Sequence, residues 1–72
     1  MNDKNVFEFV IYIIHACANK WNRYPSDVYR ILNDNNCINN FLVSHYDILH
    51  TQSTAYIVDD VKEYLNVRGV IV

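Results

Sequence analysis

Turn-forming residues are almost absent from this chain of 72 residues, which contains one glycine, Gly69, and one proline, Pro25. A β-rich fold needs many tight turns, and these depend on such residues at defined positions. Apolar residues instead recur at helical spacing in four segments. The sequence therefore predicts an all-α fold, a compact bundle of about four short helices that forms a single helical domain over residues 1–72.

The first predicted helix, from about Asp3 to Asn19 or Trp21, has an unusually wide apolar face. Its apolar side chains span an arc of roughly 220°, about twice the stripe of a typical surface helix. The flanks of this arc are Phe7, Ile11 and Ala18 on one side and Phe9 and Ala16 on the other. Because the other helices are short, we expect one flank to be partly exposed in the isolated chain and covered in an oligomer or complex.

The remaining helices are placed by their end signals. We expect the second helix to begin with Ser26 as its N-cap and to stop in the asparagine-rich run at 33–36. The third spans about Ile38–Tyr46, and the fourth runs from about Ser53 or Thr54 to Val67, followed by Gly69. The predicted core consists of Val10, Ile13, Ile14, Cys17, Val28, Ile31, Leu32, Phe41, Leu42, Ile57, Val61 and Leu65.

Residues 46–53, which we call the junction, connect the last two predicted helices and contain no glycine or proline. A simple linker would hold turn residues, so the junction is expected to be ordered, with Ile48 and Leu49 anchored in the core. Its polar side chains are expected to bond backbone groups near the last helix or to cap it. For His50, Thr51 and Gln52 a partner-binding role is equally open, whereas for Asp47 the structural role is favoured. The candidate residues here are Tyr46, Asp47, His50, Thr51 and Gln52.

Two further groups are candidates for a partner-binding surface. The last helix has an acidic face made of Asp59, Asp60 and Glu63, with Tyr56 beside it. This face is suited to a basic protein surface, although such faces are more often simply solvated. The second group is Phe7 and Phe9, one from each flank of the first helix.

Several functional classes are not expected. The formal net charge is −2 and the six Lys and Arg residues are scattered, whereas nucleic-acid binding normally leaves a basic patch. The three histidines and two cysteines lack close metal-ligand spacing, so no metal or other cofactor is predicted. No nucleophile is accompanied by both a base and an oxyanion loop, which indicates that the chain is not an enzyme.

The expected location is the cytoplasm. The apolar stretch from Val6 to Ala18 is interrupted by Glu8 and His15, and it is shorter than the ~20 residues of a membrane span. No signal-peptide pattern is visible, and two cysteines in such a chain suggest reduced thiols. We therefore expect no membrane association.

Several segments together resemble a known family. They are the apolar helix at 7–18, the helix start at 26–29 (SDVY), the junction motif Tyr-Asp-x-Leu-His-Thr-Gln, and the acidic helix containing YIVDDV at 56–61. On these segments the chain is similar to short bacterial proteins grouped as domain of unknown function 3791. The resemblance implies no established activity and no catalytic or ligand residues. Some members are encoded beside ADP-ribosyltransferase-like proteins of toxin–antitoxin type, which implies an antitoxin-like or adaptor role.

The functional expectation is therefore a protein–protein interaction module, in its most specific form an antitoxin-like partner of a bacterial toxin or effector enzyme. Two alternatives remain open. One is a DNA-binding regulator of the helix-turn-helix type, and the other is a homodimer with a purely structural role.

Overall fold

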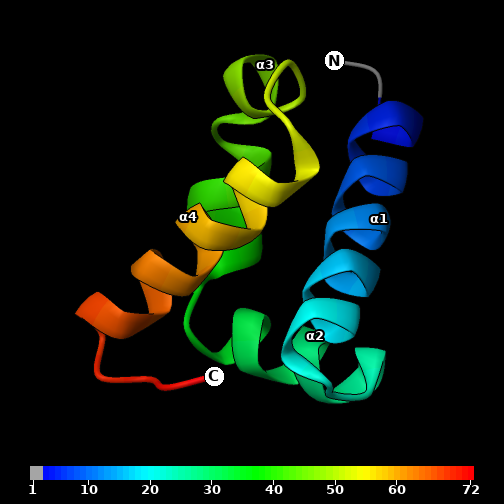
Figure 1. The fold of residues 1–72 in the computed structure, drawn as a ribbon. Helices are drawn as coiled ribbons and strands as arrows, with labels where there is room; N and C mark the ends of the chain where they lie inside the picture. The colour runs from blue at the N-terminus through cyan, green and yellow to red at the C-terminus, as the bar shows by residue number, and fades with distance from the viewer. Residues whose placement is uncertain (1–2) are drawn as a thin grey trace.

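Helices make up most of the computed structural model, which describes residues 3–72 (Figure 1). They are α1 (Asp3–Trp21), α2 (Pro25–Asp34), the π-helix η1 (Ile38–Val43), α3 (Tyr46–Leu49) and α4 (Thr54–Val67). No strand occurs among these described residues. The all-α prediction is confirmed, with one correction: the third predicted helix is divided into η1 and α3. Residues 1 and 2 of the predicted domain lie outside the described part.

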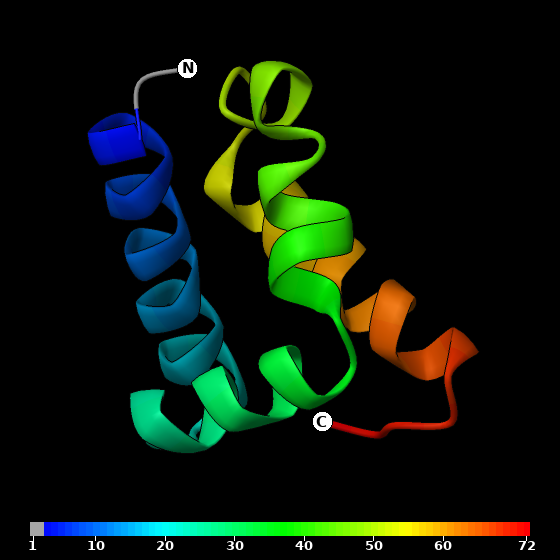
Figure 2. The same ribbon diagram turned by 180° about the vertical axis from the view of Figure 1, so that it is seen from behind.

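The long helix α1 is the element against which the others pack. It has 19 residues, and α2, η1 and α4 all contact it. Figure 1 shows α1 and α4 side by side, with α2 crossing below them. Figure 2, from behind, shows η1 beside α1 and above α2. The short α3 follows η1 at the end of the molecule opposite α2 (Figures 1 and 2).

The turn from α1 to α2 corrects one predicted helix boundary. Asn22 has a left-handed φ of 57°, which ends α1, and the Arg23 amide then donates to the Ala18 carbonyl at 2.9 Å. The helix α2 begins at Pro25, with Tyr24 as an N-cap that makes no side-chain bond. The predicted cap at Ser26 is therefore wrong. Proline has no amide hydrogen to satisfy and a helix-compatible φ, so the helix starts two residues earlier than a cap at Ser26 implies.

The asparagine-rich run stops α2 as predicted. The Asn35 side-chain amide donates to the Ile31 carbonyl at 2.8 Å, and Asn36 adopts a left-handed φ of 59°. Asparagine tolerates this conformation better than other residues with a β-carbon. The chain then enters η1, whose wider turns differ from the α-helix that was expected there.

Both ends of α4 match their sequence signals. The Ser53 hydroxyl accepts a bond from the Tyr56 amide at 3.2 Å, so Ser53 is the N-cap. At the other end Gly69 has a φ of 81°, and its amide donates to the Asn66 carbonyl at 3.0 Å. The Val70 amide donates to the Leu65 carbonyl at 2.9 Å. These two bonds form a Schellman motif.

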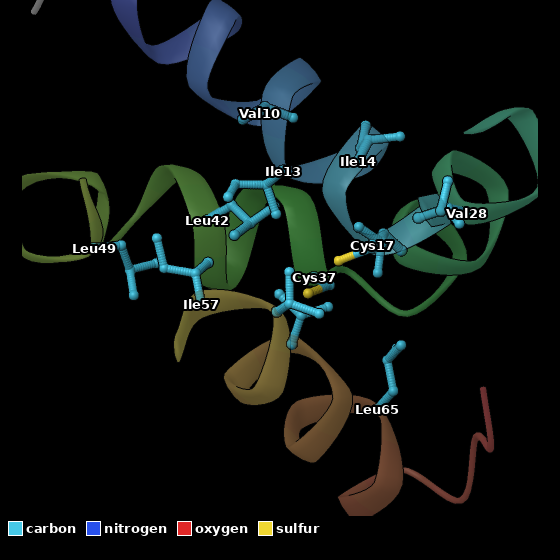
Figure 3. Close-up of a cluster of buried hydrophobic side chains, with 14 of the residues drawn as sticks. Val10, Ile13, Ile14, Cys17, Val28, Cys37, Leu42, Leu49, Ile57 and Leu65 are labelled. Atoms are coloured by element: carbon cyan, nitrogen blue, oxygen red, sulfur yellow. The ribbon is translucent and has the colours of Figure 1, made fainter. Parts of the chain in front are cut away.

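The buried side chains form one cluster between α1 and the other elements (Figure 3). Ten of the twelve predicted core residues are buried, while Ile31 and Phe41 are only partly buried at its edge. Cys37 is fully buried although the sequence suggested a loop there. The list of predicted core residues also lacked Val6, Ala18 and Val58, all of them buried.

The two cysteines meet inside this core. Figure 3 shows the sulfur of Cys17, on α1, directed toward that of Cys37, just before η1. Both are free thiols without solvent exposure. Burial raises the pKa of Cys17 to about 12, and the neighbouring Cys37 adds to the rise. Burial also raises the pKa of Cys37 to about 12, against an opposing effect of Arg68. The folded protein therefore favours neutral thiols.

The first prediction concerns the core. Leu65 is fully buried, so Leu65→Ala should lower the free energy of unfolding by about 2–5 kcal/mol, since it removes apolar contacts and leaves a cavity. The matched control is Val67→Ala in the same helix, because Val67 is 74% exposed. Urea denaturation should show the control within about 0.5 kcal/mol of wild type. Equal losses for both variants would contradict the packing described.

The second prediction concerns pH. The thiol pKa values are near 12 in the folded chain and near the ordinary 9.0 in the unfolded chain. The unfolded state therefore loses protons first, and stability should fall as pH rises above 9. The expected fall between pH 8 and pH 10 is roughly 1–3 kcal/mol, measured by urea denaturation with reductant present. A Cys17→Ala, Cys37→Ala double variant should show a shallower slope, and an unchanged slope would refute the thiol origin.

Candidate functional site

The candidate residues from the sequence lie on several surfaces of the fold, without forming one site. The junction holds one group, an apolar groove beside α1 holds Phe7, and α4 divides its acidic residues between two other grooves. Phe9 belongs to the junction surroundings, because its ring contacts Tyr46. Each surface is built from different elements and offers different chemistry.

The junction is ordered by packing and ring contacts. Leu49 is buried as predicted, but Ile48 is 63% exposed, so its predicted anchoring is wrong. The short helix α3 directs these neighbouring side chains about 100° apart, which leaves room for only one of them in the core. The Phe9 ring meets Tyr46 edge-on at 5.2 Å between ring centroids, and this contact ties α3 to α1.

The polar side chains of the junction bond locally. His50 Nδ1 donates to the Tyr46 carbonyl at 2.8 Å, and the two rings stack at 4.6 Å. The Thr51 hydroxyl donates to the Ile48 carbonyl at 2.7 Å. His50 and Thr51 thus bond backbone groups, as expected, but these groups belong to α3 and not to the last helix. Asp47 is exposed and makes no side-chain hydrogen bond within the described residues, contrary to prediction.

Four of the junction candidates are open to solvent. Asp47, His50, Thr51 and Gln52 are exposed, and of these only His50 and Thr51 have a side-chain bond among residues 3–72. The structural part of the junction is therefore Tyr46, Leu49 and the cap Ser53. The exposed polar side chains remain a candidate surface without a groove around them.

The second surface is an apolar groove along α1 with a volume of about 360 Å³. Phe7 is 66% exposed, Ile11 39% and Tyr29 51%, and all three belong to its lining. The complete lining is Val6, Phe7, Val10, Ile11, Ile14, Tyr29, Ile38 and Val43, from α1, α2 and η1. The first flank of α1 is thus partly exposed at Phe7 and Ile11, whereas its third member, Ala18, is buried.

The opposite flank of α1 is covered by this chain itself. Phe9 and Ala16 are both partly buried against the core. Ala16 lines a different groove, of about 490 Å³, between α1 and α4. One end of that groove is closed by a hydrogen bond of 2.9 Å between the Tyr12 and Thr54 hydroxyl oxygens.

The acidic residues of α4 do not lie on one continuous surface. Asp59 lines the α1–α4 groove, on the side of His15 and Lys20. Asp60 and Glu63 instead line a groove of about 310 Å³, which we call the aromatic–acidic groove. Its complete lining is Phe41, Asp60, Glu63, Tyr64, Val67 and Arg68. Tyr56, 52% exposed, lines none of these three grooves.

Sequence reasoning missed three residues that shape these grooves. Tyr29 was grouped with an apolar helix face, yet it is exposed at the edge of that face. Val43 lies in η1, whose π-helical turn shifts its side chain away from α-helical placement. The position of Arg68 could have been predicted from the sequence. It follows Tyr64 by one helical turn, the spacing at which two side chains on a helix are in contact.

Two findings concern metals and membranes. Among residues 3–72, no group of three or more His, Cys, Asp and Glu side chains is arranged to hold a metal ion. Within the same range, none of the helices combines the length and the apolar character that crossing a bilayer requires.

The third prediction tests what orders the junction. Ser53→Ala removes the acceptor for the Tyr56 amide, so the free energy of unfolding should fall by about 0.5–2 kcal/mol. Asp47→Ala is the matched control, and it should change stability by no more than about 0.5 kcal/mol because Asp47 is exposed. Thermal and urea denaturation provide the measurement. A larger loss for Asp47→Ala than for Ser53→Ala would reverse this assignment.

Comparison with known proteins identifies a family. The family model described as "Protein of unknown function (DUF3791)" matches residues 8–68, from the first turns of α1 to the end of α4. No curated protein and no solved structure matches the chain significantly. The match confirms the resemblance seen in the sequence, and the chain belongs to the DUF3791 family.

Proposed function

We propose that this protein is a protein–protein interaction module that binds an amphipathic helix of another protein in the apolar groove. The observation that carries the proposal is the exposure of Phe7 and Tyr29 on the walls of one groove, at 66% and 51%. Exposed apolar side chains scattered singly are ordinary, but several gathered in one concave surface are typical of an interaction site.

The shape of the groove suits a helix as its occupant. Phe7 and Ile11 are one helical turn apart on α1, and Tyr29 of α2 and Val43 of η1 lie across from them. A helix inserted into such a groove buries apolar side chains at positions i, i+3 or i+4, and i+7. Because the lining residues are all apolar except for the Tyr29 hydroxyl, the bound face of that helix is expected to be aliphatic or aromatic.

The amount of exposed apolar surface favours a different protein over a second copy of this chain. Phe7 and Tyr29 together expose on the order of 200 Å², since an aromatic side chain presents roughly 150–250 Å². Permanent homodimers usually bury at least about 1,000 Å² on each partner, more than the roughly 800 Å² of other stable complexes. A partner helix reaches into the groove and surrounds these side chains, whereas a flat contact between two such grooves covers only their rims.

The specific form of this proposal is an antitoxin-like role, in which the partner is a toxin or effector enzyme. Its support is the gene neighbourhood that the family resemblance implies. The acidic residues of α4 are consistent with a partner that carries a basic surface. The apolar groove is formed by α1, α2 and η1, whereas the acidic residues lie on α4. A partner helix in the apolar groove therefore leaves α4 free for a second contact.

The fourth prediction tests the groove. Phe7→Asp places a charge on its wall and should weaken the complex at least tenfold in Kd, because loss of a hot-spot anchor typically costs about 2 kcal/mol or more. The control is Ile48→Asp, an equally exposed apolar residue (63%) outside the groove. The measurement is isothermal titration of the reconstituted complex, with the partner first isolated from the native host and then purified. Circular dichroism should show unchanged helix content.

Three outcomes separate this proposal from its rivals. If Phe7→Asp and Ile48→Asp weaken the reconstituted complex equally, the groove is not the docking site. If the purified chain alone sediments as a dimer that Phe7→Asp dissociates, the groove binds a second copy and the hetero-partner proposal fails. A salt-dependent shift of duplex DNA at low protein concentration would favour the DNA-binding alternative instead. Suppression of toxicity by wild-type protein, lost with Phe7→Asp, would support the antitoxin-like form.

A further inference from the structure

The aromatic–acidic groove contains a recognition arrangement that the apolar groove does not explain. Its floor is formed by the Phe41 ring, from η1, and the Tyr64 ring, from α4. The two rings stack with centroids 5.4 Å apart and an interplanar angle of 30°. The Tyr64 hydroxyl is in reach of the Asn35 and Asn36 carbonyls, at 3.3 and 3.4 Å, and donates to them. The tyrosine ring is therefore held in place from its far end.

This groove already holds a guanidinium group of the same chain. The guanidinium carbon of Arg68 lies 3.6 Å from the centroid of the Tyr64 ring. Arg68 Nη1 also donates to the Tyr64 carbonyl at 3.2 Å. Attraction between a guanidinium plane and the electron-rich face of an aromatic ring accounts for this position. The contact shows directly which chemistry the aromatic floor accepts.

The carboxylates on the rim are not neutralised by that guanidinium. Neither Asp60 nor Glu63 forms an ion pair or a side-chain hydrogen bond with any other residue in the range 3–72. Two carboxylates and one guanidinium leave the groove with one negative charge in excess. The groove thus offers an aromatic surface and two unpaired acceptors to an incoming cation.

We propose that the aromatic–acidic groove binds an arginine side chain of a basic segment in a partner protein. The arginine stacks against the accessible part of the Phe41 ring, while Asp60 and Glu63 accept its N–H groups. Arginine fits better than lysine because its planar guanidinium both stacks on rings and bonds two carboxylate oxygens at once. The inference builds on the proposed protein partner but uses a separate surface, so the two can fail independently.

Arg68 has a defined role in this arrangement. It covers the outer face of Tyr64 and contributes a positive charge beside the incoming arginine. It therefore keeps the ligand from the Tyr64 ring, leaves it only the Phe41 ring, and repels its positive charge. Removal of this guanidinium should strengthen arginine binding, whereas removal of either rim carboxylate should weaken it. If the variants acted only by disturbing the fold, all of them would weaken arginine binding. Opposite effects on binding from residues of one groove therefore indicate a binding site.

The fifth prediction uses a peptide probe. Acetyl-Gly-Arg-Gly-amide, titrated into the full chain, should cause saturable amide shifts in ¹H–¹⁵N NMR spectra at Phe41, Glu63 and Tyr64. Glu63→Gln and Asp60→Asn should each raise its Kd about two- to fivefold, the range expected for exposed charge pairs. Arg68→Gln should lower its Kd by a similar factor. The matched control is Asp59→Asn, which removes a carboxylate from the α1–α4 groove and should leave the Kd unchanged.

Two further controls make the test decisive. The same peptide with citrulline, which is uncharged, should bind more weakly, and added salt should weaken the arginine peptide by screening. Phe7→Asp should bind the arginine peptide as wild type does, because that residue lines the apolar groove. The inference is overturned by an absence of saturable shifts, by equal binding of the citrulline peptide, by equal effects of Asp59→Asn and Glu63→Gln, or by weaker binding to Arg68→Gln.

Discussion

Burial of the wide apolar arc of α1 is the constraint on which the rest of the structure depends. Ile13 and Cys17 at the centre of the arc have no exposure to solvent, and covering them requires α2, η1 and α4 together. These elements have 10, 6 and 14 residues, against 19 in α1. Small domains bury a limited share of their surface, so part of such an arc stays uncovered. The band through Phe7 and Ile11 is that uncovered part.

The sequence predicted those parts of the fold that depend on local physical chemistry. The limits of α4 follow from a serine that accepts an amide bond at its start and a glycine that takes a positive φ after its end. The stop after α2 follows in the same way from asparagine. Each of these signals acts within a few residues. Side-chain identity is then sufficient to place a helix end without knowledge of the packing.

The parts that could not be predicted depend on contacts between distant segments. Cys37 is buried because it lies against Cys17 of α1, and no local pattern reveals this. The π-helix η1 widens the turn between two packed elements, and its hydrogen-bond spacing leaves no clear sequence period. The width of the α1 arc predicted an exposed flank, but which flank is exposed depends on Tyr46, which covers Phe9. The acidic residues are separated for a similar reason, because Asp59 turns toward α1 and Asp60 toward η1.

Of the two proposed surfaces, the apolar groove provides affinity for a partner and the aromatic–acidic groove provides selectivity among partners. An apolar groove with on the order of 200 Å² of exposed aromatic surface accepts many amphipathic helices, because burial of apolar area has little directional preference. The aromatic–acidic groove adds a condition, since a partner without a suitably placed cation leaves Asp60 and Glu63 desolvated and unpaired. The Arg68 guanidinium already lies over the Tyr64 ring, so a weakly binding partner cation gains little by displacing it. Arg68 therefore makes the requirement for a well-placed cation stricter. A partner that supplies both an apolar helix and an arginine is therefore favoured over one that supplies either alone.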